Sequence, residues 1–176
     1  VNLLYTNPDF MLEMLVNDDC EIEENGANVA VMSSAGNAVL ILSLFPGIQN
    51  LTAGCNLALT ALTNTFPNVM VSEFSQGMMF GALSKSCTYT AEQEQGAVAG
   101  MQSTAIINQS CYVLTVMFDP NVSNEEGLLI TNVFNSINVV RPEQVDQASQ
   151  TAVYTSAHPE AKPSEKSKAA SVTEWD

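Results

Sequence analysis

Basic side chains are the scarcest chemical group in this sequence. The chain has 5 Lys and Arg residues against 19 Asp and Glu residues, a net charge of −14 at pH 7. Residues 1–140 contain 13 acids and a single base, Lys85, so that part carries −12. One lysine cannot neutralise a run of phosphates, which excludes nucleic-acid binding and disfavours an anionic bilayer surface. The charge favours a basic protein or peptide as partner, and the alternative is that it serves solubility alone.

Histidine is nearly absent as well. His158 is the only one, and it lies in a stretch without apolar periodicity. No rigid histidine is available for a Ser-His-acid triad, a Cys-His pair or a histidine metal site. Residues 96–100 lack the basic residue and the following helix of a phosphate loop. We predict no enzyme activity, no metal and no cofactor; a carboxylate hydrolase using Glu73, Glu92 or Glu94 is the third hypothesis.

Long apolar runs are also missing. The longest, residues 38–45, has the length of a strand and not of a membrane span. The sequence begins with Val1 rather than Met, and one interpretation is that a leader has been removed. Low lysine with abundant Asn, Thr, Ser and Gln favours a location outside the cytoplasm, whether periplasmic, secreted or lipid-anchored. The cytoplasm is the alternative.

Cysteine occurs four times without any C-x-x-C spacing, which excludes a zinc knuckle. Cys55 and Cys111 fall within apolar periodic patterns, so we predict that both are buried thiols. Cys20 and Cys87 have weaker burial patterns. In an oxidising compartment two disulfides remain an alternative, with Cys55–Cys111 as the first candidate pair.

The chain is organised around residues 96–119, which the pattern predicts to be two long strands folded back at Asn108 and Gln109. In the second strand both faces are largely apolar. A strand of this kind must be covered on both faces, which predicts a central place in a sheet with layers above and below it. One predicted face carries Cys111, Val113, Thr115 and Met117, and the other carries Tyr112, Leu114, Val116 and Phe118.

Other segments carry start, stop and turn signals. Asn25-Gly26 predicts a hairpin. Asn50 and Ser123 are expected to cap helices over residues 51–66 and 124–137, the second with a capping box. Further predictions are a helix at 8–16, strands at 28–34, 38–45, 69–74 and 79–90, a break at Gly77 and a short edge strand at 139–140.

These elements predict an α+β fold, an α/β/α sandwich with a mostly antiparallel central sheet. Residues 1–140 are expected to form a single domain. From Arg141 the apolar residues become isolated, and we predict a flexible low-complexity tail over 141–176.

Three stretches resemble the PsbP-like fold family, which includes DcrB-like lipoproteins. They are the meander leading into a capped helix, the hairpin with Cys111 and Tyr112 after its turn, and the ending 133–137, Val-Phe-Asn-Ser-Ile. The resemblance covers about residues 20–140. These proteins usually open with a strand and an apolar-Pro-x-x-Trp segment, which this chain lacks. The resemblance implies a non-enzymatic binding or assembly factor and carries over no catalytic set.

Acidic side chains are densest at residues 17–25, and we predict the partner contact there. A calcium site is the alternative, but the spacing does not match a calcium loop, and a solvated acidic edge strand is the simplest interpretation. The only Trp, beside the C-terminus, is either a solvated end or part of a short docking motif. The predicted contact residues are Asp18, Asp19, Glu21, Glu23, Glu24 and Trp175.

The sequence therefore favours a non-enzymatic, extracytoplasmic bacterial accessory protein that acts by protein–protein contact. The alternative is an acidic cytosolic chaperone for a secreted effector. The oligomeric state is not predicted.

Overall fold

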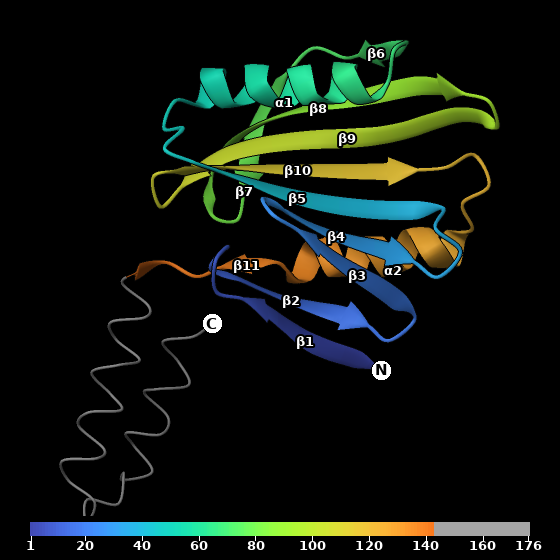
Figure 1. The fold of residues 1–176 in the computed structure, drawn as a ribbon, viewed down its shortest axis with the longest axis horizontal. Helices are drawn as coiled ribbons and strands as arrows, with labels where there is room; N and C mark the ends of the chain where they lie inside the picture. The colour runs from blue at the N-terminus through green and yellow to red at the C-terminus, as the bar shows by residue number, and fades with distance from the viewer. Residues whose placement is uncertain (143–176) are drawn as a thin grey trace, which may run out of the picture. The chain divides into compact units, whose positions relative to one another are not determined.

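An eight-stranded antiparallel sheet organises the computed structural model, which describes residues 1–142 (Figure 1). Seven strands follow one path across the sheet, and β7 pairs with β8 beside it. In spatial order the seven are β3 (Cys20–Asn25), β4 (Asn28–Ser33), β5 (Ala38–Pro46), β10 (Ser110–Phe118), β9 (Gly96–Ile107), β8 (Ala82–Gln93) and β6 (Val69–Val71), and β7 is Ser75–Met79.

The central place predicted for the second strand of the long hairpin is confirmed. Strand β10 lies between β5 and β9 in the middle of the sheet. Asn108 and Gln109 form its turn with φ of 53° and 61°, a left-handed conformation that two-residue hairpin turns require. The two side-chain faces of β10 pack against different layers, as the alternation of the sequence predicts.

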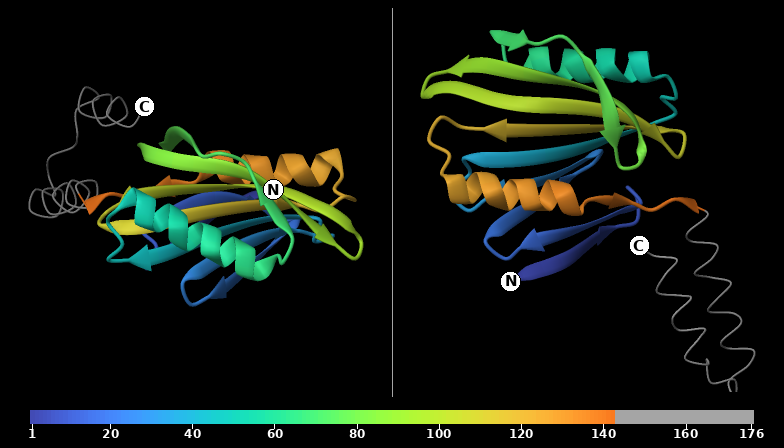
Figure 2. Two further views of the ribbon diagram at one scale, coloured as in Figure 1. Left: turned by 90° about the horizontal axis from the view of Figure 1, so that it is seen from above. Right: turned by 180° about the vertical axis from the view of Figure 1, so that it is seen from behind.

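Two helices cover opposite faces of this sheet (Figure 2). Helix α1 (Leu51–Thr65) begins at Asn50, whose side chain accepts a hydrogen bond from the Ala53 backbone N–H. Helix α2 (Asn124–Ser136) begins at Ser123 with the predicted capping box to Glu126. Both helices and both caps are confirmed, and with them the α+β fold with helices on either side of an antiparallel sheet.

The predicted helix at residues 8–16 is wrong. Strands β1 (Asn2–Asn7) and β2 (Leu12–Asn17) form a hairpin there, and β11 (Asn138–Val139) pairs with β2 to complete a second sheet of three strands. The short edge strand near residue 139 is thus confirmed. The strand at Asn2–Asn7 was not expected from the sequence.

The physical reason is that Asn7 serves a turn and not a helix. Its side-chain oxygen accepts hydrogen bonds from the backbone N–H groups of Asp9 and Phe10, both at 3.1 Å. Met11 then takes φ of 50°, which reverses the chain. Buried Leu12, Met14 and Val16 alternate along β2 with period two, although the same stretch also contains a helical spacing.

A second error concerns the strands before the long hairpin. Gly77 does not break the chain, since β7 passes through it and pairs with β8. The break falls at Phe80 and Gly81, with φ of 53° and 74°, so this glycine forms a tight turn and does not lie inside a strand. The first predicted strand of this region is limited to β6.

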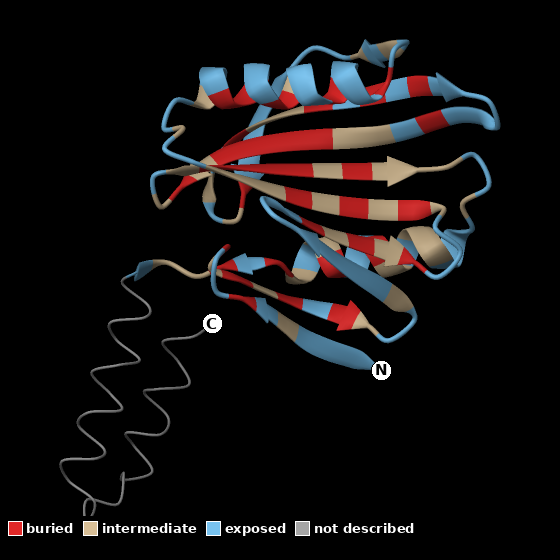
Figure 3. Ribbon diagram, in the orientation of Figure 1, coloured by how far each residue is buried: buried red, intermediate tan, exposed pale blue. Residues whose placement is uncertain are grey.

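The packing differs between the two faces of the sheet. On the α2 face, one continuous cluster of buried apolar residues joins the sheet to α2 and to the three-stranded sheet. On the α1 face, there are two smaller clusters, one around Leu62 and Tyr89 and the other around Ala58 and Val113. Figure 3 shows buried residues alternating with partly buried ones along much of β5, a continuous buried stretch in the first half of β10, and a largely exposed β3.

Candidate binding site

Neither helix covers the whole of its face. Helix α1 packs mainly on β8, β9 and β10, and α2 packs mainly on β2, β4 and β5. The half of the sheet formed by β3, β4 and β5 is therefore uncovered on the α1 face. Its side chains there are mainly partly buried on β4 and β5 and exposed on β3, and a groove runs from them to the flank of α1.

We call this hollow the α1 groove. Its volume is about 370 Å³. Strand residues form its floor, and one flank of α1 forms its wall. The lining consists of Glu23, Asn25, Asn28, Ala30, Ile41, Ser43, Ala61, Leu62, Thr65, Phe66, Gln102, Thr115 and Met117.

Strand register explains how residues so distant in the sequence share this floor. Five of the lining residues are successive cross-strand partners, so they form one row across β9, β10, β5, β4 and β3. The row is Gln102, Thr115, Ile41, Ala30 and Glu23. It is polar at both ends and apolar in the middle, and we call it the groove row.

Gln102 closes the buried end of the groove row. It is 4% exposed, and its Nε2 donates to the Ala58 carbonyl at 3.2 Å and to Thr115 Oγ1 at 3.3 Å. Its Oε1 is buried without a hydrogen-bond partner among residues 1–142. A buried acceptor without a donor costs about 1–3 kcal/mol, and a ligand donor that entered the groove and reached it would recover that cost.

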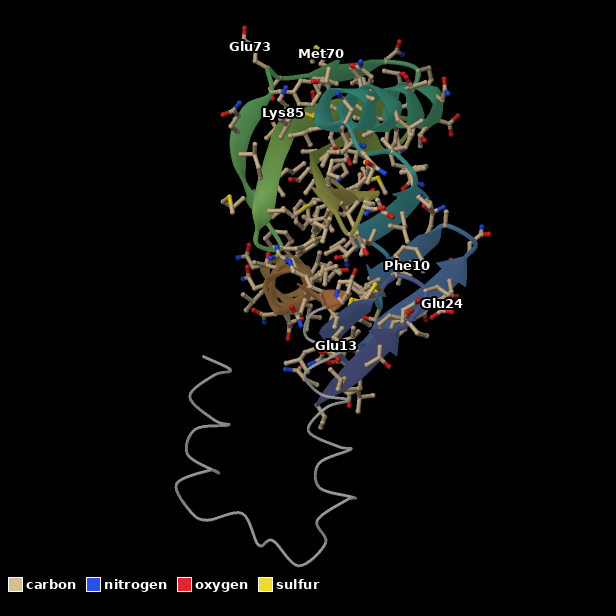
Figure 4. The ribbon with its side chains drawn as sticks, turned by 90° about the vertical axis from the view of Figure 1, so that its left-hand side faces the viewer. Phe10, Glu13, Glu24, Met70, Glu73 and Lys85 are labelled. Carbon is tan, nitrogen blue, oxygen red and sulfur yellow. The ribbon has the colours of Figure 1, made fainter. Side chains whose placement is uncertain are left out.

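Glu23 forms the exposed end of the groove row. It lies on β3, where Glu21 and Glu23 face the groove side because their partners Met32 and Ala30 do. No hydrogen bond or ion pair is found for the Glu23 carboxylate within the described part of the chain. Lys85 lies far across the sheet on β8 (Figure 4).

The five predicted acids are thus split by the alternation of β3 and do not form one patch. Glu24 points to the opposite side, where its carboxylate accepts hydrogen bonds from the Tyr5 hydroxyl and, at 3.4 Å, from Asn7 Nδ2. Asp18 accepts a hydrogen bond of 2.6 Å from the Val1 ammonium, which lowers the Asp18 pKa. Asp19 is exposed in the preceding turn.

The surroundings of Tyr5 raise the pKa of its hydroxyl. Partial burial is the larger cause, and the hydrogen bond to Glu24 is the next.

Trp175, the remaining predicted contact, and His158 lie outside the described residues. Among residues 1–142, no group of side chains is placed to hold a metal ion, and no helix has the length and apolarity of a membrane span.

The cysteines are free thiols in the structure. Burial of Cys55 and Cys111 is confirmed, at 4% and 0% exposed. The weaker burial expected of Cys87 is wrong, because this residue of β8 is 3% exposed. Cys20 is half-buried. Burial raises the pKa of all four thiols, that of Cys111 to about 11.

A larger hollow of about 580 Å³ lies mainly over the uncovered half of the α2 face, around Met70, Thr88, Met101 and Phe118. It is lined by no carboxylate or basic side chain, and no orphaned buried polar atom is found there. The α1 groove is the better candidate site because it combines an apolar floor with convergent polar groups.

Comparisons with known proteins show the fold. No protein-family model and no curated protein matches the sequence. Among solved structures, a mutant of the protein Mog1 has a TM-score of 0.54 at 11% identity, covering 81% of this chain and 98% of that one. The PsbP protein CyanoP of the cyanobacterium Synechocystis has a TM-score of 0.57 at 11% identity, covering 79% and 92%.

A Bacteroides thetaiotaomicron protein has a TM-score of 0.52 at 10% identity, covering 76% of this chain and 46% of that one. Identities this low are evidence for shared architecture and not for shared activity. Together with the sheet order and the two helices, they confirm the architecture predicted from the sequence: this chain has the PsbP-like fold.

Proposed function

We propose that this protein is a non-enzymatic binding or accessory protein that recognises a basic protein or peptide along strand β3. The observation that carries the proposal is the position of the acids. Strand β3 is an exposed edge strand, and it presents Glu21 and Glu23 on the side that holds the α1 groove. Residues 1–140 contain one base, so the potential around these acids is negative.

Charge of this kind acts mainly on encounter and specificity. A basic partner is attracted over about one Debye length, which is about 10 Å at 0.1 M salt. Association should therefore slow steeply as salt rises above that concentration. Two acidic copies of this chain repel each other in the same field, so the acids on β3 also discourage edge-to-edge pairing.

The test is capture of partners from the native extract at low salt, using the full chain. One variant neutralises Asp18, Asp19, Glu21, Glu23 and Glu24 to Asn and Gln. The control variant neutralises five acids elsewhere, namely Asp9, Glu13, Glu73, Glu92 and Glu94, and so has the same net charge.

Loss of salt-sensitive capture in the first variant alone supports the proposal. Equal capture by both variants would mean that the acids of β3 serve solubility, and the proposal would fail. Equal loss in both would assign the effect to net charge and would also contradict a contact at β3.

The proposed setting is outside the bacterial cytoplasm, supported by the low lysine content and the abundance of Asn, Thr, Ser and Gln. Four free thiols are an observation in favour of the second candidate, an acidic cytosolic secretion chaperone, because reducing compartments preserve thiols. Fractionation of cells expressing the full-length gene product separates the two. Recovery with the envelope or medium supports the first, and recovery with the cytosol supports the second.

A further inference from the structure

The groove row has the dimensions of a short extended peptide. Neighbouring strands lie about 4.8 Å apart, so the four spacings from Glu23 on β3 to Gln102 on β9 span about 19 Å. Ile41 on β5 lies two spacings, about 10 Å, from Glu23. A polyproline II segment advances about 3.1 Å per residue and has three residues per turn, so residues three positions apart face the same side; about three residues reach Ile41 and about six reach Gln102.

The middle of the row accepts an aliphatic side chain. Ile41 and Ala30 are partly buried on the floor, with Met117 beside them. Leu62 of α1 and Phe66, its C-cap residue, line the wall and are themselves buried. An aliphatic group placed here removes the partly exposed apolar surface of the floor from water.

The two ends of the row need opposite hydrogen-bonding partners. Glu23 is a carboxylate without a cation among the described residues, and it therefore fits an ammonium or a guanidinium group. Gln102 has an acceptor oxygen without a donor there, so it fits an N–H or O–H group. The protein supplies acceptors at both ends of the row and no basic side chain in the groove.

From these features we propose that the α1 groove binds an extended segment of a partner protein that crosses the strands of the sheet. The segment carries a basic residue over Glu23 and, three positions away, an aliphatic residue over Ile41. A hydrogen-bond donor three positions further on reaches Gln102, so that all three side chains face the groove. This inference rests on the proposed function and specifies the partner segment that β3 and the groove recognise.

The probes are short blocked peptides titrated into isotope-labelled full-length protein and followed by NMR. The first is acetyl-Lys-Ser-Pro-Leu-Ser-Pro-Asn-amide, whose prolines favour the polyproline II conformation. The second peptide has the reverse order, because the row does not fix the direction in which the chain crosses it. Two matched peptides replace Lys by Glu, or Leu by Ser. We expect saturable shifts at Ala30, Ile41 and Met117, and at the side-chain amide of Gln102, with at least one order of the Lys-Leu peptide.

Ala61 and Ala53 supply a matched pair of variants. Both are exposed residues of α1, but only Ala61 lines the groove. Ala61→Trp fills the groove and should raise the peptide Kd at least about tenfold, whereas Ala53→Trp should leave it within about twofold. Glu23→Gln should raise the Kd about two- to fivefold, the range of an exposed ion pair, and reduce its dependence on salt.

The inference is overturned if neither order of the peptide gives saturable shifts up to millimolar concentration. It is also overturned if the Glu peptide or the Leu-to-Ser peptide binds equally well, or if Ala61→Trp leaves binding unchanged. If the groove fails these tests while the β3 acids still govern salt-sensitive capture, the proposed function stands without the groove. If the peptide binds while capture is independent of the β3 acids, the groove site stands and the proposed function fails.

Discussion

The two faces of strand β10 differ in how completely they are packed. On the α2 face, Tyr112, Leu114 and Val116 are 1%, 0% and 6% exposed and belong to one continuous core. On the α1 face, Cys111 and Val113 are buried, but Thr115 and Met117 are only partly so. Both faces belong to the same nine-residue strand.

Two polar side chains interrupt the packing of the α1 face. Gln102 on β9 and Thr115 on β10 are cross-strand partners, and they lie between the two apolar clusters of that face. The continuous core on the α2 face holds the architecture together. The α1 face is less completely packed and leaves room for the groove. The part of the sheet that contributes least to stability is therefore the part available for binding.

A large effect is expected at Gly100 on the α1 face. The Tyr89 ring lies against this glycine, and its hydroxyl donates a 3.0 Å hydrogen bond to the Val116 carbonyl. A Cβ at position 100 would overlap both the Tyr89 ring and the Val116 oxygen. Gly100→Ala should destabilise the protein by about 3 kcal/mol or more, at the upper end of overpacking effects, measured by urea unfolding.

Gly77→Ala is the matched control. It introduces the same methyl group into β7, where the nearest atom, Ser84 Oγ, lies 3.6 Å away in ordinary contact. Its effect on the free energy of unfolding should be less than about 1 kcal/mol. Equal effects of the two substitutions would mean that the close approach of Tyr89 to Gly100 is not what limits the position.

Two leucines compare the faces directly. Leu40 lies in the continuous core on the α2 face, and Leu62 lies in the small cluster beside the α1 groove, at 1% and 4% exposed. Leu→Ala substitutions in cores cost about 2–5 kcal/mol, and the cost falls where the site can collapse. We expect Leu40→Ala near the top of that range and Leu62→Ala near the bottom. A larger cost for Leu62→Ala than for Leu40→Ala would contradict the view that the α2 face contributes more to stability than the α1 face.

Much of the architecture could be predicted because its signals are local. Asn50 and Ser123 are helix caps in both sequence and structure, and the alternation along β10 assigned its two faces correctly. The hairpin of β1 and β2 was missed because Asn7-Pro8 is a signal for turns as well as for helix starts. The spacing of the apolar residues there fits the period of a strand and that of a helix alike, so it could not distinguish the two structures.

The groove row could not be predicted, because it depends on the register of five strands. Glu23 and Gln102 are 79 positions apart in the sequence and meet only through four pairings. The density of acidic residues in the sequence drew attention to residues 18–24, but side chains alternate along β3, which divides these acids between the two sides of the sheet. A lone Gln in a predicted strand gives no sign of an unpaired acceptor.

A smaller effect is expected at the helix starts, where a pH profile distinguishes the two faces. The Ser123 backbone N–H, and then Ser33 and Asn37, donate to the Glu126 carboxylate and lower its pKa from 4.5 to about 2. Because the folded-state pKa lies below the unfolded value, this contribution is complete above about pH 4.5 and is lost as the pH falls towards 2.

Glu126→Gln should therefore flatten the acid side of the stability profile. Asn50→Ala, at the start of α1, should cost about 1 kcal/mol equally at pH 3 and pH 7, because no titrating group takes part in that cap. Thermal unfolding at several pH values measures both. An unchanged acid slope in Glu126→Gln would contradict the role given to this carboxylate.

The smallest expected effect concerns cysteine reactivity, which tests the packing of the α1 face without a destabilising substitution. Cys55, Cys87 and Cys111 are buried on that face, whereas half-buried Cys20 begins β3. Only the thiolate reacts with an alkylating agent, and a thiol with a pKa of about 11 is about one part in a thousand thiolate at pH 8.

In native protein, N-ethylmaleimide should therefore modify one cysteine rapidly and three slowly. Cys20→Ser should remove the rapid phase, and urea should make every remaining thiol reactive. Rapid modification of a second thiol in native protein would show that α1 opens from the sheet readily, and the groove wall would then be a mobile element rather than a preformed surface.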